Sequence, residues 1–431
     1  MAAVPTARSV AARVLERVFE DQAFAAAALD AELSRSAQLA ERDRALATEL
    51  VYGVLRTHGA LEKRIRRFAP RKIKDPSTAI ELWLAAYQIL LLDRVPAFAA
   101  VDAAVEAVRR RRGERMGGFA NAVLRKLAAS KERLTLADAV VESAPGWLVE
   151  RLVSAVGDEQ ARALLGAGEV LDAPSVRLTE GHAEPEWLGG ATPGKVASAA
   201  RRFTRRGDLR RLAGYDEGAF SVQEEGAQVV ALLLGAEPGE RVLDACAGRG
   251  QKAALLAEQV GATGSVFATD LHPSKLDALA REFERLKLPL PERRAVDWSV
   301  GTADVPAGFD RVLVDAPCSG TGTLRHRPEI LLRLGPEDPA RLADVATGIL
   351  RAAASRARAG GQVVFAVCSV LPEEGEAVVA RVLDLLEPAS FDAPALASLP
   401  VLVPPGATSL RLLPREHGTD GYFVASFRRR A

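Results

Sequence analysis

Two cysteines stand where two apolar, valine-rich runs of the sequence break, and each is followed by serine. Cys318 lies in the segment DAPCSG and Cys368 in the segment VVFAVCSV, fifty positions later. A thiolate can add to C6 of a cytosine, which makes C5 nucleophilic enough to take a methyl group, and a second acid–base group can then help to remove the C5 proton. Two thiols at predicted strand ends therefore indicate methyl transfer to C5 of a cytosine. The pattern leaves open which thiol attacks.

The chain contains one further cysteine, Cys246, and three cysteines are too few for a disulfide framework. None of the three has the spacing of a zinc ligand set, so we expect no metal site. A lone buried cysteine usually behaves as a small hydrophobic residue. The repetition of Cys-Ser at two strand ends favours chemistry over that simpler interpretation.

A sheet must bring such distant thiols together, and the sequence from about residue 220 onward predicts one. Five short runs rich in valine occur there, and helical segments separate several of them. This alternation is typical of a doubly wound parallel α/β sheet, which binds ligands beyond the carboxyl ends of its strands. The predicted strands are residues 241–246, 265–270, 293–297, 311–317 and 361–369.

A glycine-containing loop, CAGRGQK, follows the first of these strands and opens a predicted helix. Its glycines allow the backbone to approach a ligand, and the helix amino terminus offers amide donors to a carboxylate or phosphate. With Ala253 the loop also fits the pattern G-x-G-x-x-A, so an NAD-dependent oxidoreductase is an alternative. That activity would give the two thiols no task. The candidate cofactor loop comprises Cys246, Ala247, Gly248, Arg249, Gly250, Gln251 and Lys252.

Acidic residues end the next three predicted strands, and they complete the candidate cofactor site. Asp270 follows the second strand, where a carboxylate suits ribose hydroxyls in NAD enzymes and in S-adenosylmethionine enzymes alike. Asp297 is expected near an adenine amino group, with Trp298 packed on the ring. Asp315 ends the fourth strand, three residues before Cys318. An isolated aspartate is usually a loop or cap residue, but three at one sheet edge favour a binding site.

The 431 residues suffice for two or three domains, and the hydrophobic pattern changes twice along the chain. Residues 1–140 show helical spacing throughout and predict a bundle of about six helices. Residues 141–219 are mixed and predict a small α+β linker domain. Residues 220–431 carry the predicted sheet.

Three clusters of basic residues lie outside the predicted sheet, although the net charge of the whole chain is only +1. Such clusters can bind the phosphates of an RNA backbone without reading its sequence. A basic run is as often a solvated face, but three of them favour RNA as a partner. They are Lys63, Arg64, Arg66, Arg67, Arg71, Lys72 and Lys74; Arg109 to Arg112 with Arg115; and Arg201, Arg202, Arg205, Arg206, Arg210 and Arg211.

No apolar run of the sequence reaches the length of a membrane-spanning helix. The amino terminus also lacks the order of charged and apolar residues of a signal peptide. We therefore expect a cytoplasmic protein that makes no membrane contact and acts as a monomer.

Three longer segments, together with the two Cys-Ser sites, resemble the RsmB/Sun family of RNA cytosine-C5 methyltransferases over nearly the whole chain. FANAVLRKL at 119–127 is similar to the RNA-binding domain of NusB-type factors. SVQEEGAQ at 221–228 resembles the start of the family's catalytic domain, and HGTDGYFVASF at 417–427 resembles its closing hairpin. The resemblance implies a NusB-like helical domain, a small linker domain and a Rossmann-like class I methyltransferase domain.

The resemblance also implies roles for the site residues. Cys368 would be the nucleophile, and Cys318 would assist breakdown of the covalent adduct. The loop 246–252, Asp270, Asp297 and Asp315 would bind S-adenosylmethionine, and the substrate would be RNA, most simply 16S ribosomal RNA. The loop reads Gly-Arg-Gly-Gln-Lys where the family usually has Ala-Pro-Gly-Gly-Lys. An RNA-binding or ribosome-assembly factor with a degenerate cofactor site is therefore the alternative function.

Overall fold

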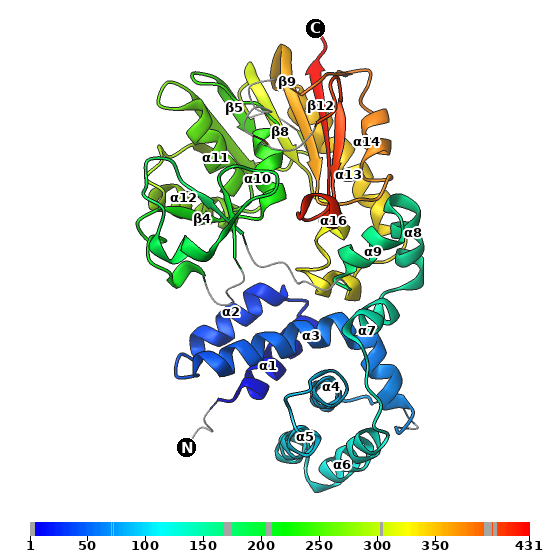
Figure 1. Ribbon diagram of the computed structural model, residues 1–431. Coiled ribbons are helices and arrows are strands. Elements are labelled where there is room, and N and C mark those ends of the chain that lie inside the picture. The colour runs from blue at the N-terminus through cyan, green and yellow to red at the C-terminus, as the bar shows by residue number, and fades with distance from the viewer. Residues whose placement is uncertain are drawn as a thin grey trace. The chain divides into compact units, whose positions relative to one another are not determined.

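The computed structural model describes residues 5–69, 71, 73–167, 175–203, 209–301, 305–391, 399 and 403–431. It divides into two compact units. The first comprises residues 1–150, 161–171 and 324–333, and the second comprises residues 151–160, 172–323 and 334–431. Figure 1 shows helices alone in the amino-terminal part of the chain and a sheet flanked by helices in the rest.

The first unit is helical, as the periodicity predicts, and its helices begin at recognisable caps. Thr6 and Ser9 form a reciprocal capping box at the first helix, and the Asp75 side chain accepts a hydrogen bond from the Thr78 amide at the fourth, which Pro76 opens. Apolar side chains such as Val14, fully buried, form one core. The helices are α1 (Ala7–Phe19), α2 (Ala25–Arg35), α3 (Glu41–Arg66), α4 (Pro76–Leu91), α5 (Ala97–Arg112), α6 (Glu114–Ala129) and α7 (Leu136–Ser143).

A short segment from far along the chain completes the first unit. Residues 324–333 include the 3-10 helix η4 (Pro328–Leu332), and they directly follow the loop that carries Cys318. The Arg56 guanidinium donates to the Arg325 carbonyl at 2.8 Å, and the buried Glu329 carboxylate accepts from the Ala25 amide at 3.4 Å. The segment is thus held by buried polar contacts to α2 and α3.

The residues from 146 to 222 form two helices and a small sheet. The helices are α8 (Gly146–Val156) and α9 (Asp158–Leu165). The antiparallel sheet has the order β2-β3-β1-β4, and Trp187 packs edge-on against Phe203 and Phe220 in its small core. Its strands are β1 (Ser175–Leu178), β2 (Thr192–Pro193), β3 (Ala200–Arg202) and β4 (Phe220–Val222), with the 3-10 helices η1 (Glu186–Gly190) and η2 (Leu209–Arg211) between them.

An eight-stranded sheet is the centre of the second unit, with the order β10-β12-β9-β8-β5-β6-β7 and β11 paired to β12. The five strands from β9 to β7 are parallel, and β12 runs antiparallel to β9. The strands are β5 (Arg241–Asp244), β6 (Ser265–Asp270), β7 (Glu292–Ala295), β8 (Phe309–Asp315), β9 (Ala357–Val367), β10 (Leu386–Pro388), β11 (Ser409–Leu412) and β12 (Tyr422–Arg429).

Successive residues of a strand point to opposite faces of the sheet. Both faces of this sheet are apolar, so helices cover both. Val242 and Leu313 belong to the core cluster shared with one group of helices, whereas Leu243 and Val312 belong to the cluster shared with the other. The first group is α10 (Glu225–Leu232), α11 (Gln251–Val260) and α12 (Pro273–Arg285); the second is α13 (Asp338–Ala354) and α14 (Glu376–Ala380). This doubly wound arrangement confirms the predicted fold class.

The remaining short elements lie near the carboxyl ends of the parallel strands or at the end of the chain. They are the 3-10 helix η3 (Thr321–Thr323), which follows Cys318, and α16 (Pro414–His417), which precedes β12. Within the described residues, no helix is both long enough and apolar enough to cross a membrane.

Candidate active site

The two thiols predicted from the sequence lie in contact. β8 and β9 are parallel neighbours with Asp315 opposite Ala366, so the residues that follow each strand leave the sheet side by side. Cys318 comes from the loop after β8 and Cys368 comes directly after β9. Their Sγ atoms are 3.4 Å apart, and both side chains are partly buried. The sheet therefore brings together two nucleophiles that are distant in sequence.

Gly322 joins the two thiol loops to a third segment. Its amide donates to the Cys368 carbonyl at 3.0 Å, and its own carbonyl accepts from the Gly421 amide at 2.9 Å. A Cβ atom on Gly322 would lie 1.9 Å from the Gly421 carbonyl oxygen. Only glycine fits where these three backbones meet, so the closing turn before β12 is part of the site.

A partly buried ion pair lies beside the thiols. The Lys252 ammonium, from the first turn of α11, is 2.6 Å from a carboxylate oxygen of Asp315 at the end of β8. Burial alone would lower the pKa of Lys252, but Asp315, Asp244 and Cys368 together raise it. The site therefore holds a positive charge within electrostatic range of Cys368.

The three cysteines differ in their surroundings. A hydrogen bond to Cys368 is the largest cause that raises the pKa of Cys318, followed by burial and by the charges of Cys368 and Glu374. Burial, followed by the negative charge of Asp244, raises the pKa of Cys246. Cys318 and Cys246 are thus held as neutral thiols in the resting site.

The candidate cofactor loop has the backbone that its glycines predict. Gly248 has φ +57° and Gly250 has φ +90°, both in the left-handed region. A Cβ atom on Gly250 would lie 2.6 Å from the side chain of Leu279, so glycine is also needed there for packing. Gln251 is the first residue of α11 and Arg249 is exposed. The substitutions that distinguish this loop from the family pattern fall where the backbone tolerates them.

Asp270 braces this loop from the end of β6. One carboxylate oxygen accepts from the Gly248 amide at 3.1 Å, and the other accepts from the His272 amide at 2.9 Å. Lys275 lies 3.2 Å away. The side chain is buried, so its charge is directed at the cofactor loop and at the start of α12.

Asp297 and Trp298, which we expect beside an adenine, follow the end of β7. β7 ends at Ala295, and the exposed Asp297 accepts hydrogen bonds from the amide and hydroxyl of Ser299. The Trp298 indole is buried and donates to the Ala245 carbonyl at 2.9 Å. Trp298 therefore packs in the core beneath the strand ends.

Asp244, which is buried at the end of β5, could not be predicted as a site residue from the sequence pattern. Neither of its carboxylate oxygens has a hydrogen-bond partner within the described part of the chain. Burial is the largest cause that raises its pKa to about 7. Buried polar atoms usually have partners, and an orphaned acid beside the loop 246–252 fits a site that receives a polar ligand. The residues present thus fit S-adenosylmethionine.

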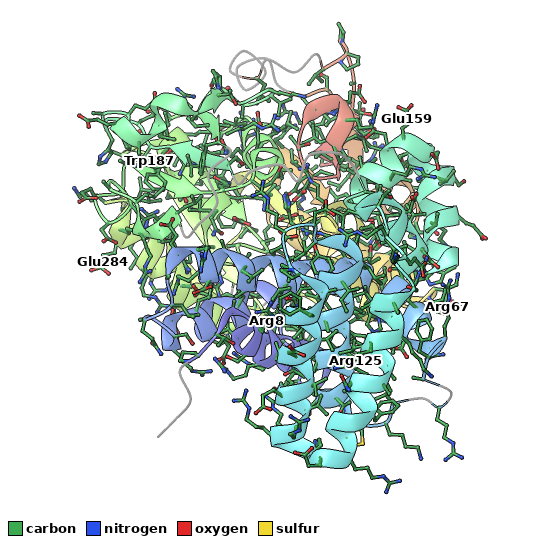
Figure 2. The ribbon with its side chains drawn as sticks, turned by 60° about the horizontal axis from the view of Figure 1, so that its bottom comes forward. Arg8, Arg67, Arg125, Glu159, Trp187 and Glu284 are labelled. Carbon is green, nitrogen blue, oxygen red and sulfur yellow. The ribbon has the colours of Figure 1, made fainter. Side chains whose placement is uncertain are left out.

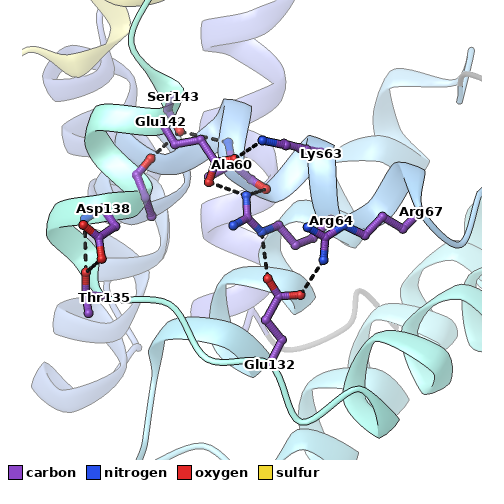
Figure 3. Close-up of polar contacts among 10 residues, drawn as sticks. Ala60, Lys63, Arg64, Arg67, Glu132, Thr135, Asp138, Glu142 and Ser143 are labelled. Atoms are coloured by element: carbon purple, nitrogen blue, oxygen red, sulfur yellow. Dashed lines mark hydrogen bonds and ion pairs between the residues drawn. The ribbon is translucent and has the colours of Figure 1, made fainter.

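The basic clusters of the first unit are largely paired with carboxylates (Figure 3). Lys63 is 2.6 Å from Glu142, and Arg67 is 2.8 Å from Glu132. Arg64 contacts both of these glutamates. The second cluster is paired in the same way: Arg109 with Glu106 and Glu114, Arg110 with Glu106, Arg111 with Glu16, and Arg112 with Asp75. These clusters are therefore weaker phosphate sites than the sequence alone indicates.

The helix α6 presents basic side chains of a different kind. Arg125 is exposed on it (Figure 2), and Lys126 is exposed beside it. The Arg125 guanidinium donates to the Asn121 amide oxygen at 3.0 Å. Among the residues that the structure describes, no ion pair involves Arg125 or Lys126. In the third cluster Arg201 pairs with Glu184, while Lys72 of the first and Arg205 and Arg206 of the third lie outside the described residues.

Groups of three or more histidine, cysteine or acidic side chains with the geometry of a metal site do not occur in the described ranges. The candidate site itself contains two thiols, a lysine and several carboxylates.

Comparison with known proteins relates this fold and site to a family. Residues 231–428 match the family model described as 16S rRNA methyltransferase RsmB/F, and residues 5–129 match the NusB family. A probable ribosomal RNA small subunit methyltransferase B of Bacillus subtilis is 30% identical over 98% of both chains. The corresponding protein of Thermus thermophilus is 36% identical over 93% of this chain and 92% of its own.

A solved structure named PH0851 has the same fold, with a TM-score of 0.82 and 20% identity over 99% of both chains. These findings confirm the predicted resemblance and its cofactor, and they show that the oxidoreductase alternative is wrong. The chain belongs to the RsmB/F family of S-adenosylmethionine-dependent rRNA methyltransferases.

Proposed function

We propose that this protein methylates C5 of a cytosine in 16S ribosomal RNA through a covalent bond between Cys368 and C6 of the base. The observation that carries the proposal is the contact of two thiols, 3.4 Å apart, beside the partly buried pair of Lys252 and Asp315. Methylation of a ribose hydroxyl or an amino group would not require a nucleophilic thiol, and still less two of them.

Cys368 is the better nucleophile of the two. It accepts the hydrogen bond that keeps Cys318 neutral, and the positive charge of Lys252 acts on it. Attack by its thiolate forms a carbon–sulfur bond at C6 and moves the ring electrons toward C5. S-adenosylmethionine supplies the methyl group as an electrophile on a sulfonium centre when bound.

Cys318 removes the C5 proton after the methyl group has been transferred. Its pKa is raised chiefly by the hydrogen bond to Cys368, and this cause disappears once the Cys368 sulfur is bonded to carbon. Cys318 then becomes a stronger acid and releases its own proton to solvent, which leaves the thiolate that acts as the base. When it takes the C5 proton, the C5–C6 double bond forms again and the Cys368 thiolate leaves. The attack of Cys368 on C6 therefore makes Cys318 available as the base.

The chain holds its cofactor by the loop between β5 and α11. The positive φ angles of Gly248 and Gly250 allow close approach to the backbone, and Asp270 is placed to accept hydrogen bonds from ribose hydroxyls. Because the loop keeps this backbone despite its unusual sequence, methyl transfer is better supported than the alternative of an RNA-binding factor with a degenerate cofactor site.

The name of the relatives and the NusB match support ribosomal RNA as the substrate. A cytosine must leave its stack before a thiol can reach C6, which costs a few kcal/mol in a helix. A base in a loop or in unassembled RNA costs less. We therefore expect free or partly assembled 16S rRNA to be a better substrate than the finished small subunit.

The two cysteines can be distinguished by trapping. With 16S rRNA and S-adenosylmethionine, Cys318→Ala should form the bond to C6 but fail to resolve it, so that a denaturant-resistant protein–RNA complex accumulates. Cys368→Ala should form no such complex and no 5-methylcytosine, as bisulfite sequencing of the RNA would show. Trapping by Cys368→Ala, and none by Cys318→Ala, would reverse the roles. Methylation at the wild-type rate by both variants would refute the mechanism.

A further inference from the structure

A buried glutamate beyond β9 contacts both thiol loops. Glu374 is 1% exposed, and one of its carboxylate oxygens accepts from the Ser319 amide at 2.6 Å. Its other oxygen is 2.5 Å from the Ser319 hydroxyl and 2.6 Å from the Ser369 hydroxyl. Because Ser319 follows Cys318 and Ser369 follows Cys368, one carboxylate binds the residue next to each thiol.

Further hydrogen bonds tie the two loops together around this carboxylate. The Thr321 and Ser369 hydroxyls are 2.9 Å apart. The Val370 amide donates to Thr321 at 3.4 Å, and the Leu371 amide donates to Ser369 at 3.2 Å. An ionised carboxylate accepts only, so both serine hydroxyls donate to it and the Thr321 hydroxyl donates to Ser369. Each hydroxyl then has one direction, which favours a single arrangement of the loops.

We propose that Glu374 is a positioning residue that fixes the distance between the Cys318 and Cys368 sulfurs. This inference deepens the proposed function and rests on it. The side chain touches neither sulfur, and it acts through the two serines. Its removal would leave the Ser319 amide and two hydroxyls without a buried acceptor, and the loops would separate or become mobile.

The charge of Glu374 adds a second effect of the same residue. It contributes to the causes that raise the pKa of Cys318, whereas Lys252 acts on Cys368. The two charges thus act on different thiols. Glu374 thus supports the division of roles between the two cysteines as well as their spacing.

The rate of disulfide formation measures the spacing of two thiols without any need for RNA or cofactor. Diamide takes one hydrogen from each thiol and is reduced to the hydrazine, and the two sulfurs form a bond. In the full-length reduced protein, mass spectrometry of peptides distinguishes the Cys318–Cys368 disulfide from products of Cys246. The variants are Glu374→Ala and Glu374→Gln, with Glu373→Gln as the control because Glu373 lies outside the network and pairs with Arg151.

We expect wild type and Glu373→Gln to form the disulfide at the same rate, and Glu374→Ala to form it roughly 10- to 100-fold more slowly, since a displacement of about 1 Å has effects of this size. Methylation by Glu374→Ala should show a lower kcat with an unchanged KM for RNA. If Glu374→Ala does not fold, as judged by circular dichroism, the rate of disulfide formation in Glu374→Gln tests the inference instead. The single side-chain oxygen of glutamine cannot accept all three hydrogen bonds that Glu374 accepts, so we expect this variant to be slower too.

Disulfide formation at the control rate by a folded Glu374 variant would overturn the inference. A wild-type protein that forms the disulfide rapidly but methylates no cytosine would refute the proposed function and leave the positioning role intact. The two failures are therefore distinguishable.

Discussion

Replacement of Asp270 by asparagine tests how the chain holds its cofactor. The carboxylate accepts from the Gly248 amide and from the His272 amide, and it lies 3.2 Å from Lys275. Asparagine has one oxygen and an NH₂ group, so it can accept one of these backbone bonds and must turn a donor toward the other N–H. The substitution therefore loosens the loop and also removes the charge that we place beside the ribose.

The magnitude follows from these contacts. Lys275 is half exposed, so its ion pair contributes little. A hydrogen bond to a charged acceptor contributes about 1.5 to 3 kcal/mol, which corresponds to roughly a 10- to 150-fold increase in Kd for S-adenosylmethionine. Isothermal titration calorimetry measures this directly, and Asp277→Asn, at an exposed position of the nearby helix α12, is the matched control. A folded Asp270→Asn protein with the Kd of wild type would refute the placement of this carboxylate.

Three further results are expected. Glu81 is buried in the helical unit, and burial is the largest cause that raises its pKa from 4.5 to about 7; because the unfolded chain releases this proton first, the free energy of unfolding should fall by about 3 kcal/mol between these pH values. Glu81→Gln should abolish that loss, and urea titrations with the same pH dependence in both proteins would contradict it. Gly322→Ala should cost about 1 to 3 kcal/mol of stability and most of the methylation, because its Cβ has no room. In contrast, Gly348→Ala, with open space around it inside α13, should leave methylation unchanged and raise stability by about 0.5 to 1 kcal/mol. Arg125→Glu with Lys126→Glu should weaken RNA binding and flatten its salt dependence; an unchanged salt slope in filter binding would show that α6 is a solvated face.

Much of the fold follows from local patterns in the sequence. The valine-rich runs are strands because both faces of a parallel sheet are buried, and a continuous apolar run is what such a strand requires. The positions of the strand ends are predicted less accurately. β7 stops at Ala295 and β9 at Val367, each two residues before the predicted end, because the sequence pattern does not mark where regular pairing along a strand ends.

The candidate site could be predicted where its residues follow strands, and not where they depend on the conformation of loops. Cys318 and Cys368 meet because neighbouring parallel strands end at one edge. The contacts of Glu374 arise from a turn that no spacing rule describes. Asp244 reads as the last residue of an apolar run, and only the structure shows that its carboxylate is buried without a partner.

Long-range pairing explains why the basic clusters were overestimated. Arg64 and Arg67 share Glu132, which lies more than sixty residues away in the sequence. Ion pairs between residues three or four positions apart on one helix, such as Arg66 and Glu62, can be predicted from the sequence. Ion pairs between two helices cannot be predicted in this way, because they depend on how the helices pack.

The segment 324–333 decides how this protein can be cut into fragments. A fragment that ends at residue 150 lacks the carbonyl that accepts from Arg56 and the Glu329 carboxylate that binds the Ala25 amide. A fragment that begins at residue 172 retains the segment but has lost those partners, so Leu332, which packs against the helical core in the intact protein, would face water. The two fragments expressed separately should therefore be less soluble than the whole chain. Mixing them should restore folding only if the segment 324–333 of the second fragment binds again to its partners in the first.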